Sequence, residues 1–149
     1  MKQSAGILLF QKMPWRFLIV HPGGPFWKNK DSGAWSIPKG EFMDDEDALA
    51  AAKREFHEET GIVIDGDFTT LVPVKLKSGK MVHAFALEMY VDTSSIVSNE
   101  FEMEWPPKSG KKIMVPEIDK AEWFDLPTAL EKINEAQREL LRQVVGSEL

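Results

Sequence analysis

The chain has 149 residues, of which 43% are hydrophobic and 28% charged, with a formal net charge of −6 and no cysteine. These values are typical of one globular domain with a buried core. The apolar runs are only strand-sized, so we expect no membrane span, and the acidic balance disfavours long nucleic acids, which need a basic face. The lack of cysteine excludes disulfides and thiolate metal sites, so any metal must bind oxygen or imidazole; it also suits a cytoplasmic protein. The oligomeric state stays open.

The first third of the chain predicts strands and a loop. Residues 4–10 and 17–21 are β-like runs joined by a hairpin connection. Residues 21–33 are rich in proline and glycine and predict a loop. Residues 34–37 predict a short strand that Pro38 ends.

The middle of the chain contains the clearest helix, predicted over residues 44–60. Asp44 or Asp45 can cap this helix, and Gly61 can terminate it. After it, residues 68–76 and 81–91 alternate between apolar and polar side chains, which predicts two long antiparallel strands joined by a turn.

The last third predicts a long polar loop over residues 93–112, a short strand over 122–124 and a terminal helix over 126–145. Mixed strands with one helix in mid-chain and one at the end indicate an α/β fold. We expect a helix–sheet–helix sandwich with a mixed central sheet.

Three glutamates gather on one side of the predicted central helix. At about 100° per residue, Glu55, Glu58 and Glu59 fall within a stripe about 100° wide, next to an apolar stripe that would face the sheet. Like charges at this spacing repel each other, and the second half of a helix disfavours negative charge. A hard cation such as Mg²⁺ removes the repulsion. We therefore hypothesise a metal site, the alternative being an acidic helix face in solvent.

The segment from Gly40 to Ile62 resembles the Nudix box, G-x5-E-x7-R-E-U-x-E-E-x-G-U, in which U is aliphatic or aromatic. Every specified position matches: Gly40, Glu46, Arg54, Glu55, Phe56, Glu58, Glu59, Gly61 and Ile62. The resemblance extends over nearly the whole chain and implies a single Nudix hydrolase domain over residues 1–149. Nudix enzymes hydrolyse a nucleoside diphosphate linked to a further group. Arg54 is then expected to orient Glu46 or Glu55.

The resemblance further implies that Glu55, Glu58 and Glu59 ligate Mg²⁺ or Mn²⁺, with the carbonyl of Lys39 as a common additional ligand. Glu117 precedes a tryptophan at an offset similar to that of a loop glutamate in diadenosine polyphosphate hydrolases. We expect Glu117 to be another metal ligand or the general base, with Glu58 as the competing base. The alternative is that Glu117 is a loop acid in solvent.

The W-x-x-P-K-G motif at residues 35–40 resembles that of the diadenosine polyphosphate and diphosphoinositol polyphosphate hydrolases. The segments HPGGPFW and FEMEWPP resemble a bacterial group of predicted NTP pyrophosphohydrolases. The expected partner is a small nucleotide, bound by lysines that contact phosphates and by aromatic rings that stack on a base. The candidate contacts are Lys39, Lys28, Phe26, Trp27 and Trp35. The alternatives are solvated lysines and aromatic rings that hold their loops against the body.

The leading hypothesis is therefore metal-dependent hydrolysis of dinucleoside polyphosphates or nucleoside triphosphates. A second hypothesis is removal of pyrophosphate from RNA 5′ ends or from diphosphoinositol polyphosphates, which the acidic net charge disfavours. A third is a Nudix-fold nucleotide-binding regulator without catalysis. Such proteins usually lose acids of the box, and all of them are present here.

Overall fold

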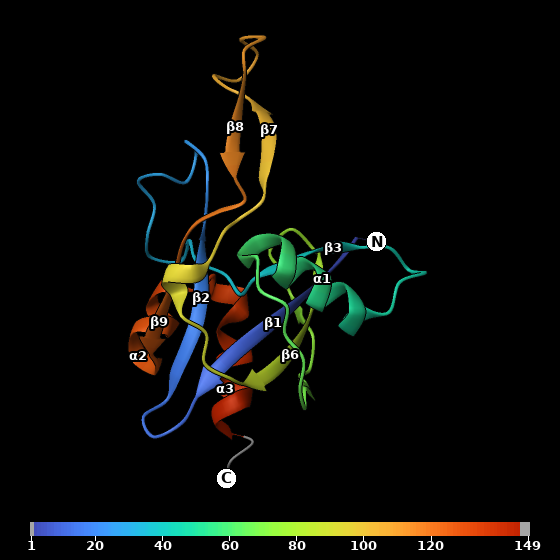
Figure 1. Ribbon diagram of the computed structural model, residues 1–149, viewed down its shortest axis with the longest axis vertical. Coiled ribbons are helices and arrows are strands. Elements are labelled where there is room, and N and C mark those ends of the chain that lie inside the picture. Colours follow the sequence, from blue (N-terminus) through green and yellow to red (C-terminus); the bar gives the residue numbers. More distant parts are fainter. Residues whose placement is uncertain (1, 147–149) are drawn as a thin grey trace.

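A seven-stranded mixed sheet forms the centre of the protein in the computed structural model, which describes residues 2–146 (Figure 1). Strand β1 lies in its middle, pairs antiparallel with β2 and β3 at one edge and runs parallel to β6 at the other. Strand β2 continues the sheet by pairing antiparallel with β9. The strands are β1 (Gln3–Gln11), β2 (Arg16–Pro22), β3 (Lys39–Phe42), β4 (Thr69–Thr70), β5 (Val74–Lys75), β6 (Met81–Glu88) and β9 (Ile118–Asp125).

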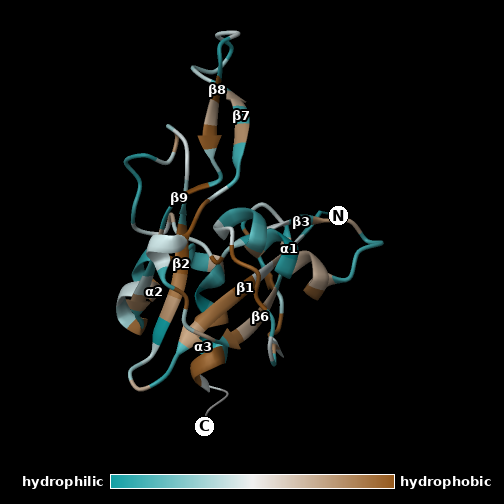
Figure 2. Ribbon diagram, in the orientation of Figure 1, coloured by the Kyte–Doolittle hydropathy of each residue, from teal (hydrophilic) through white to brown (hydrophobic). Residues whose placement is uncertain are grey.

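Helices cover both faces of this sheet. Helix α1 (Ala48–Thr60) packs on one face, where alternate β1 residues such as Ile7 and Leu9 meet Phe56. Helices α2 (Leu126–Lys132) and α3 (Arg138–Gly146) cover the other face, where Leu8 packs with Leu140. Figure 2 shows the hydrophobic residues concentrated along β1 and β2, between these layers. The predicted helix–sheet–helix fold with a mixed sheet is confirmed.

The start of α1 differs from the prediction. Asp47, rather than Asp44 or Asp45, is the N-cap, and its carboxylate accepts a hydrogen bond from the backbone N–H of Ala50 at 3.0 Å. The end of the helix is confirmed, because Gly61 has a left-handed backbone with φ of 75° and its N–H bonds the carbonyl of His57 at 2.7 Å.

Two predicted strands also differ. Residues 34–37 form only isolated bridges, from Ser36 to Val20 and from Trp35 to Ile133. The strand begins after Pro38 instead, where β3 pairs with the N-terminal half of β1. The long strand predicted over 68–76 is broken into β4 and β5, separated by a segment that contains Pro73, which has no N–H for a continuous ladder.

The prediction of one long polar loop over residues 93–112 is wrong. It contains a short 3₁₀ turn, Thr93–Ser95, and then a hairpin of β7 (Glu100–Glu104) and β8 (Lys112–Pro116) that extends away from the body (Figure 1). The glutamates that alternate with Phe101 and Met103 made this strand resemble a loop. Strand β9 is correspondingly longer than the predicted 122–124.

The predicted terminal helix is interrupted. Helix α2 ends at Lys132, because Ile133 has an extended backbone with ψ of 150°. Asn134 then caps the 3₁₀ turn Glu135–Gln137, which leads into α3. Within residues 2–146, no helix has the length and apolar character needed to cross a membrane.

Candidate metal centre

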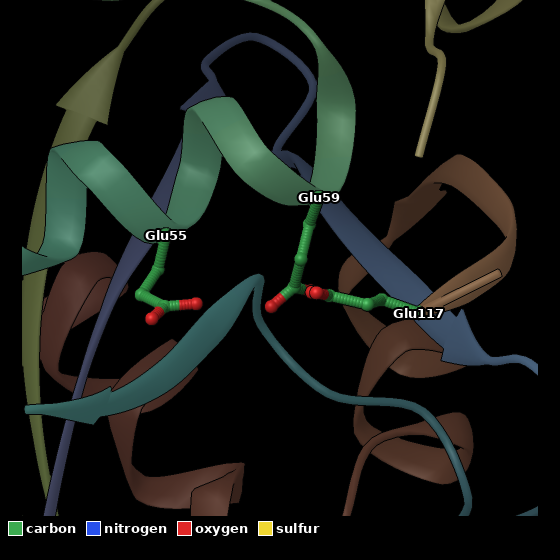
Figure 3. A group of neighbouring side chains, drawn as sticks. All are labelled: Glu55, Glu59 and Glu117. Carbon is green, nitrogen blue, oxygen red and sulfur yellow. The ribbon is translucent and has the colours of Figure 1, made fainter. Parts of the chain in front are cut away.

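Three carboxylates from two distant parts of the chain meet beside the C-terminal half of α1. Glu55 and Glu59 lie one turn apart on α1, and Glu117 lies between β8 and β9. Figure 3 shows Glu55 and Glu59 extending from the helix and Glu117 reaching the carboxylate of Glu59 from a separate segment, at the right of the view. One carboxylate oxygen of each lies within 4.8 Å of the others. This spacing allows one cation to contact all three side chains.

The three carboxylates are electrostatically unfavourable without a cation. Glu55 is 8% exposed and Glu59 is 6% exposed. Burial, followed by repulsion from Glu117 and Glu55, raises the pKa of Glu59 to about 9. Burial also raises the pKa of Glu55 and that of Glu117. The negative charge of the three carboxylates is therefore costly, and either a proton or a bound cation relieves it.

The backbone of β3 passes directly against Glu55. A Cβ atom at Gly40 would lie 2.0 Å from Oε2 of Glu55, so only glycine leaves room for this carboxylate. The next backbone N–H upstream, that of Lys39, donates to Oε2 of Glu59 at 3.2 Å. Both helix glutamates are thus positioned by the start of β3.

Arg54 contacts both of its predicted partners. Its Nε and Nη2 donate to the two carboxylate oxygens of Glu46 at 3.0 and 2.9 Å, and its Nη1 donates to Oε1 of Glu55 at 2.8 Å. These charged hydrogen bonds raise the pKa of the Arg54 guanidinium. Arg54 therefore connects the segment before α1 to the carboxylate of Glu55.

Glu58 is not a member of this group of three carboxylates within the part of the chain that the structure describes, although its charge, after burial, contributes to the raised pKa of both Glu55 and Glu117. Its side chain is 35% exposed, and its Oε1 lies 3.4 Å from Nη1 of Arg54. On a helix, Glu58 is rotated by about 100° from Glu59, whereas Glu55 is rotated by only about 40°, which explains the difference.

Backbone hydrogen bonds at the base of the β7–β8 hairpin position Glu117. The N–H of Asn99 donates to the carbonyl of Glu58 at 2.9 Å, and the carbonyl of Asn99 accepts from the N–H of Glu117 at 2.8 Å. The N–H of Gly23 donates to the carbonyl of Glu117 at 3.1 Å. The sequence offered no signal for Asn99, because its contribution is made entirely by the backbone.

A pocket of about 290 Å³ opens beside the carboxylates. It is lined by Val20, Pro22, Ser36, Ile37, Lys39, Glu59, Phe101, Glu117 and Ile118. Lys39 is the one predicted substrate contact among these residues. Its pKa is lowered by burial and then by the charge of Lys80. The lining thus combines three charged side chains, those of Lys39, Glu59 and Glu117, with mostly apolar ones.

The other predicted substrate contacts lie elsewhere in residues 2–146. Trp35 is 2% exposed and belongs to the core, where its indole N–H donates to Oδ1 of Asp31 at 2.7 Å. Phe26 and Trp27 contact each other edge to face at 5.0 Å in the loop after β2. Lys28 is exposed in the same loop. The structure does not bring these four residues into the pocket.

The family and fold of the chain are shown by comparison with known proteins. A model of the NUDIX domain matches residues 2–144. The NUDIX domain of Shewanella oneidensis NrtR, solved with ADP ribose, is 17% identical, with a TM-score of 0.66 over 99% of this chain and 88% of that one. A Caenorhabditis elegans Ap4A hydrolase is 20% identical, with a TM-score of 0.64 over 97% of both chains.

Two further comparisons extend this picture. A MutT structure from work on Aliivibrio salmonicida and Vibrio cholerae is 13% identical, with a TM-score of 0.59 over 97% of this chain and 96% of that one. An octanoyltransferase of Myxococcus xanthus is 32% identical over 104 residues, which are 68% of this chain but 25% of that protein. This chain thus spans a quarter of the curated relative. With the complete box and the fold, the domain match confirms the predicted resemblance: the chain belongs to the Nudix family.

Proposed function

We propose that this protein hydrolyses a diphosphate linkage in a dinucleoside polyphosphate or a nucleoside triphosphate, with Mg²⁺ or Mn²⁺ bound by Glu55, Glu59 and Glu117. Membership of the Nudix family supports a hydrolase acting on phosphorus anhydrides. The observation that carries the proposal is the convergence of three carboxylate oxygens within 4.8 Å. Octanoyl transfer is not proposed, because the relative with that name is matched over only 25% of its length.

The three carboxylates fit a hard divalent cation. All of the donor atoms are oxygens, which Mg²⁺ and Mn²⁺ prefer, and the burial of Glu55 and Glu59 makes their negative charges costly without a cation. Few protein ligands leave coordination positions for water and for substrate phosphates, as is usual for Mg²⁺. When bound, the cation would polarise phosphoryl oxygens and lower the pKa of water.

The remaining residues of the site suggest how the reaction is divided between them. Water attacks a phosphorus atom, and the bond from that phosphorus to the bridging oxygen breaks, releasing a phosphate leaving group. We assign the proton lost by water to Glu58, because its carboxylate is outside the cluster of ligands and 35% exposed. Lys39, which lines the pocket, would meet the charge of the phosphates, and Arg54 would orient Glu55.

A second class of substrate is favoured by one observation. Lys2, Lys75 and Lys80 line a neighbouring cavity of about 570 Å³ together with Glu41. Besides burial, the charge of Lys80 lowers the pKa of Lys39, so this group of lysines would add to the positive charge that a diphosphoinositol polyphosphate requires. The ion pair between Lys80 and Glu41, at 2.9 Å, partly neutralises this group. We therefore place nucleotides first.

A substrate panel tests the proposal. Diadenosine tetraphosphate, ATP, ADP-ribose and a diphosphoinositol polyphosphate are each incubated with Mg²⁺, with Mn²⁺ and with EDTA, in water labelled with heavy oxygen. We expect diadenosine tetraphosphate to yield ATP and AMP, with one labelled oxygen in one product, and we expect EDTA to abolish the reaction. Turnover that persists in EDTA, or no turnover of any nucleotide with either metal, would contradict the proposal. Two variants then distinguish the proposed base, Glu58, from the proposed metal ligand, Glu117. Both Glu58→Gln and Glu117→Gln should lower activity, but only Glu117→Gln should weaken binding of the metal.

A further inference from the structure

The hairpin of β7 and β8 supplies one wall of the pocket beside the carboxylates. Phe101 of β7 lines this pocket together with Ile118, and its side chain is 41% exposed. The same pocket is lined by Glu59 and Glu117, so the ring lies close to the candidate metal centre. A large aromatic ring that remains accessible beside buried carboxylates is suited to contact with a planar apolar group.

The two faces of the hairpin have different surroundings. Phe101 is paired with Val115, so these side chains share one face. A Cβ atom at Gly24 would lie 3.8 Å from Cγ2 of Val115, which shows that this face packs against the loop after β2. On the opposite face Glu102 is paired with Met114, and Met114 is 57% exposed. Only the first face therefore borders the pocket.

The backbone of the hairpin connects this wall to the carboxylates. Asn99, two residues before Phe101, bonds the carbonyl of Glu58 at 2.9 Å and the N–H of Glu117 at 2.8 Å. At the other root, the N–H of Ile118 donates to Oγ of Ser98 at 3.1 Å. The base of the hairpin that carries Phe101 is thus hydrogen-bonded to the segment that carries Glu117.

We infer that Phe101 is a substrate-specificity residue, on which the nucleobase of the substrate stacks while its diphosphate lies at Glu55, Glu59 and Glu117. The inference rests on the proposed function and adds the position of the base. The apolar side chains of the pocket accept the base, and Lys39 and the cation accept the phosphates. Stacking of one base on one ring predicts a loss of about 5- to 150-fold in nucleotide affinity when the ring is removed.

The test compares Phe101→Ala, Phe101→Trp and a control, Met114→Ala, which removes an exposed apolar side chain from the opposite face of the same hairpin. KM and kcat are measured with diadenosine tetraphosphate and with 5-phosphoribosyl 1-pyrophosphate, a diphosphate without a base. We expect Phe101→Ala to raise KM for the dinucleotide by roughly tenfold or more, with kcat and the values for the base-free diphosphate unchanged. Phe101→Trp should retain tight binding, and Met114→Ala should resemble the parent.

Binding without turnover provides an independent measurement. The affinity of the α,β-methylene analogue of ATP, measured by calorimetry with Mg²⁺, should fall by the same factor in Phe101→Ala. An unchanged KM and affinity in Phe101→Ala, or equal losses for both substrates, would overturn the inference. If the parent hydrolyses no nucleotide, the proposed function fails, while the calorimetric comparison still decides whether Phe101 binds the base.

Discussion

Replacement of Glu59 by glutamine should stabilise the metal-free protein and weaken its response to metal. Glu59 is 6% exposed, and burial with repulsion from two other carboxylates raises its pKa from 4.5 to about 9. Because the pKa of Glu59 is higher in the folded state than in the unfolded state, its protonation stabilises the folded protein. This stabilisation is complete below pH 4.5 and is lost as the pH rises toward 9. Glutamine has no such charge, and its amide oxygen can still accept the N–H of Lys39.

The size of the effect follows from the pKa difference. At about 1.4 kcal/mol per pH unit, the free energy lost between pH 4.5 and pH 7 is about 3 kcal/mol. Glu59→Gln should regain this amount in EDTA at pH 7, which corresponds to roughly 6–12 °C in Tm for a chain of this size. At pH 5 the variant and the parent should melt at nearly the same temperature, because Glu59 is then protonated in the folded state.

Thermal unfolding between about pH 5 and pH 8.5, in EDTA and in saturating Mg²⁺, measures the stability of the metal-free protein and its increase on binding metal. The parent should gain stability from Mg²⁺, and Glu59→Gln should gain much less, because one ligand is missing. Glu122→Gln, on the exposed surface of β9, is the matched control and should change neither curve. The reasoning is refuted if Glu59→Gln melts below the parent in EDTA at pH 7, or if Mg²⁺ shifts both proteins equally.

Three other substitutions test separate parts of the structure. Gly40→Ala places a Cβ atom 2.0 Å from the carboxylate of Glu55 and so displaces this carboxylate. We expect kcat to fall by at least about tenfold and the Mg²⁺-induced shift in Tm to become smaller. Unchanged metal binding would contradict the close contact. Arg54→Lys cannot make the two parallel bonds to Glu46, so the metal concentration for half-maximal activity should rise, while the circular dichroism spectrum stays the same. Trp35→Phe removes a buried indole N–H donor and should lower the free energy of unfolding by about 1–3 kcal/mol with no change in KM; a raised KM would restore its predicted role in substrate binding.

Prediction from sequence succeeded best within single elements. The helix that carries the box was predicted because capping, alanine content and the terminating glycine are local properties. Its periodicity placed Glu55, Glu58 and Glu59 on one stripe, of which the structure brings Glu55 and Glu59 into the group of carboxylates. The first hairpin and the fold class were also correct. The N-cap was misplaced by two to three residues, because the aspartates before the helix are equivalent cap residues and only the backbone distinguishes them.

Prediction failed where one segment is stabilised by another. Strand β7 alternates glutamates with apolar residues, and only its pairing with β8 makes it a strand rather than a polar loop. Trp35 was predicted to contact substrate, but its position depends on the packing of α2 and β9 around it. Phe101 begins the segment FEMEWPP but was not predicted as a site residue, because nothing local indicates that its ring will line the pocket.

The sequence by itself determined the family of the protein, through the spacing of its acids and glycines, and it determined which helix carries two of the three carboxylates. Only the tertiary structure decided that Glu117 completes this group, that Glu58 is not a member of it and that Phe101 lines the pocket. Helical spacing is set by the backbone of each helix, whereas contacts between distant segments depend on sheet register and on the hydrogen bonds that anchor the hairpin.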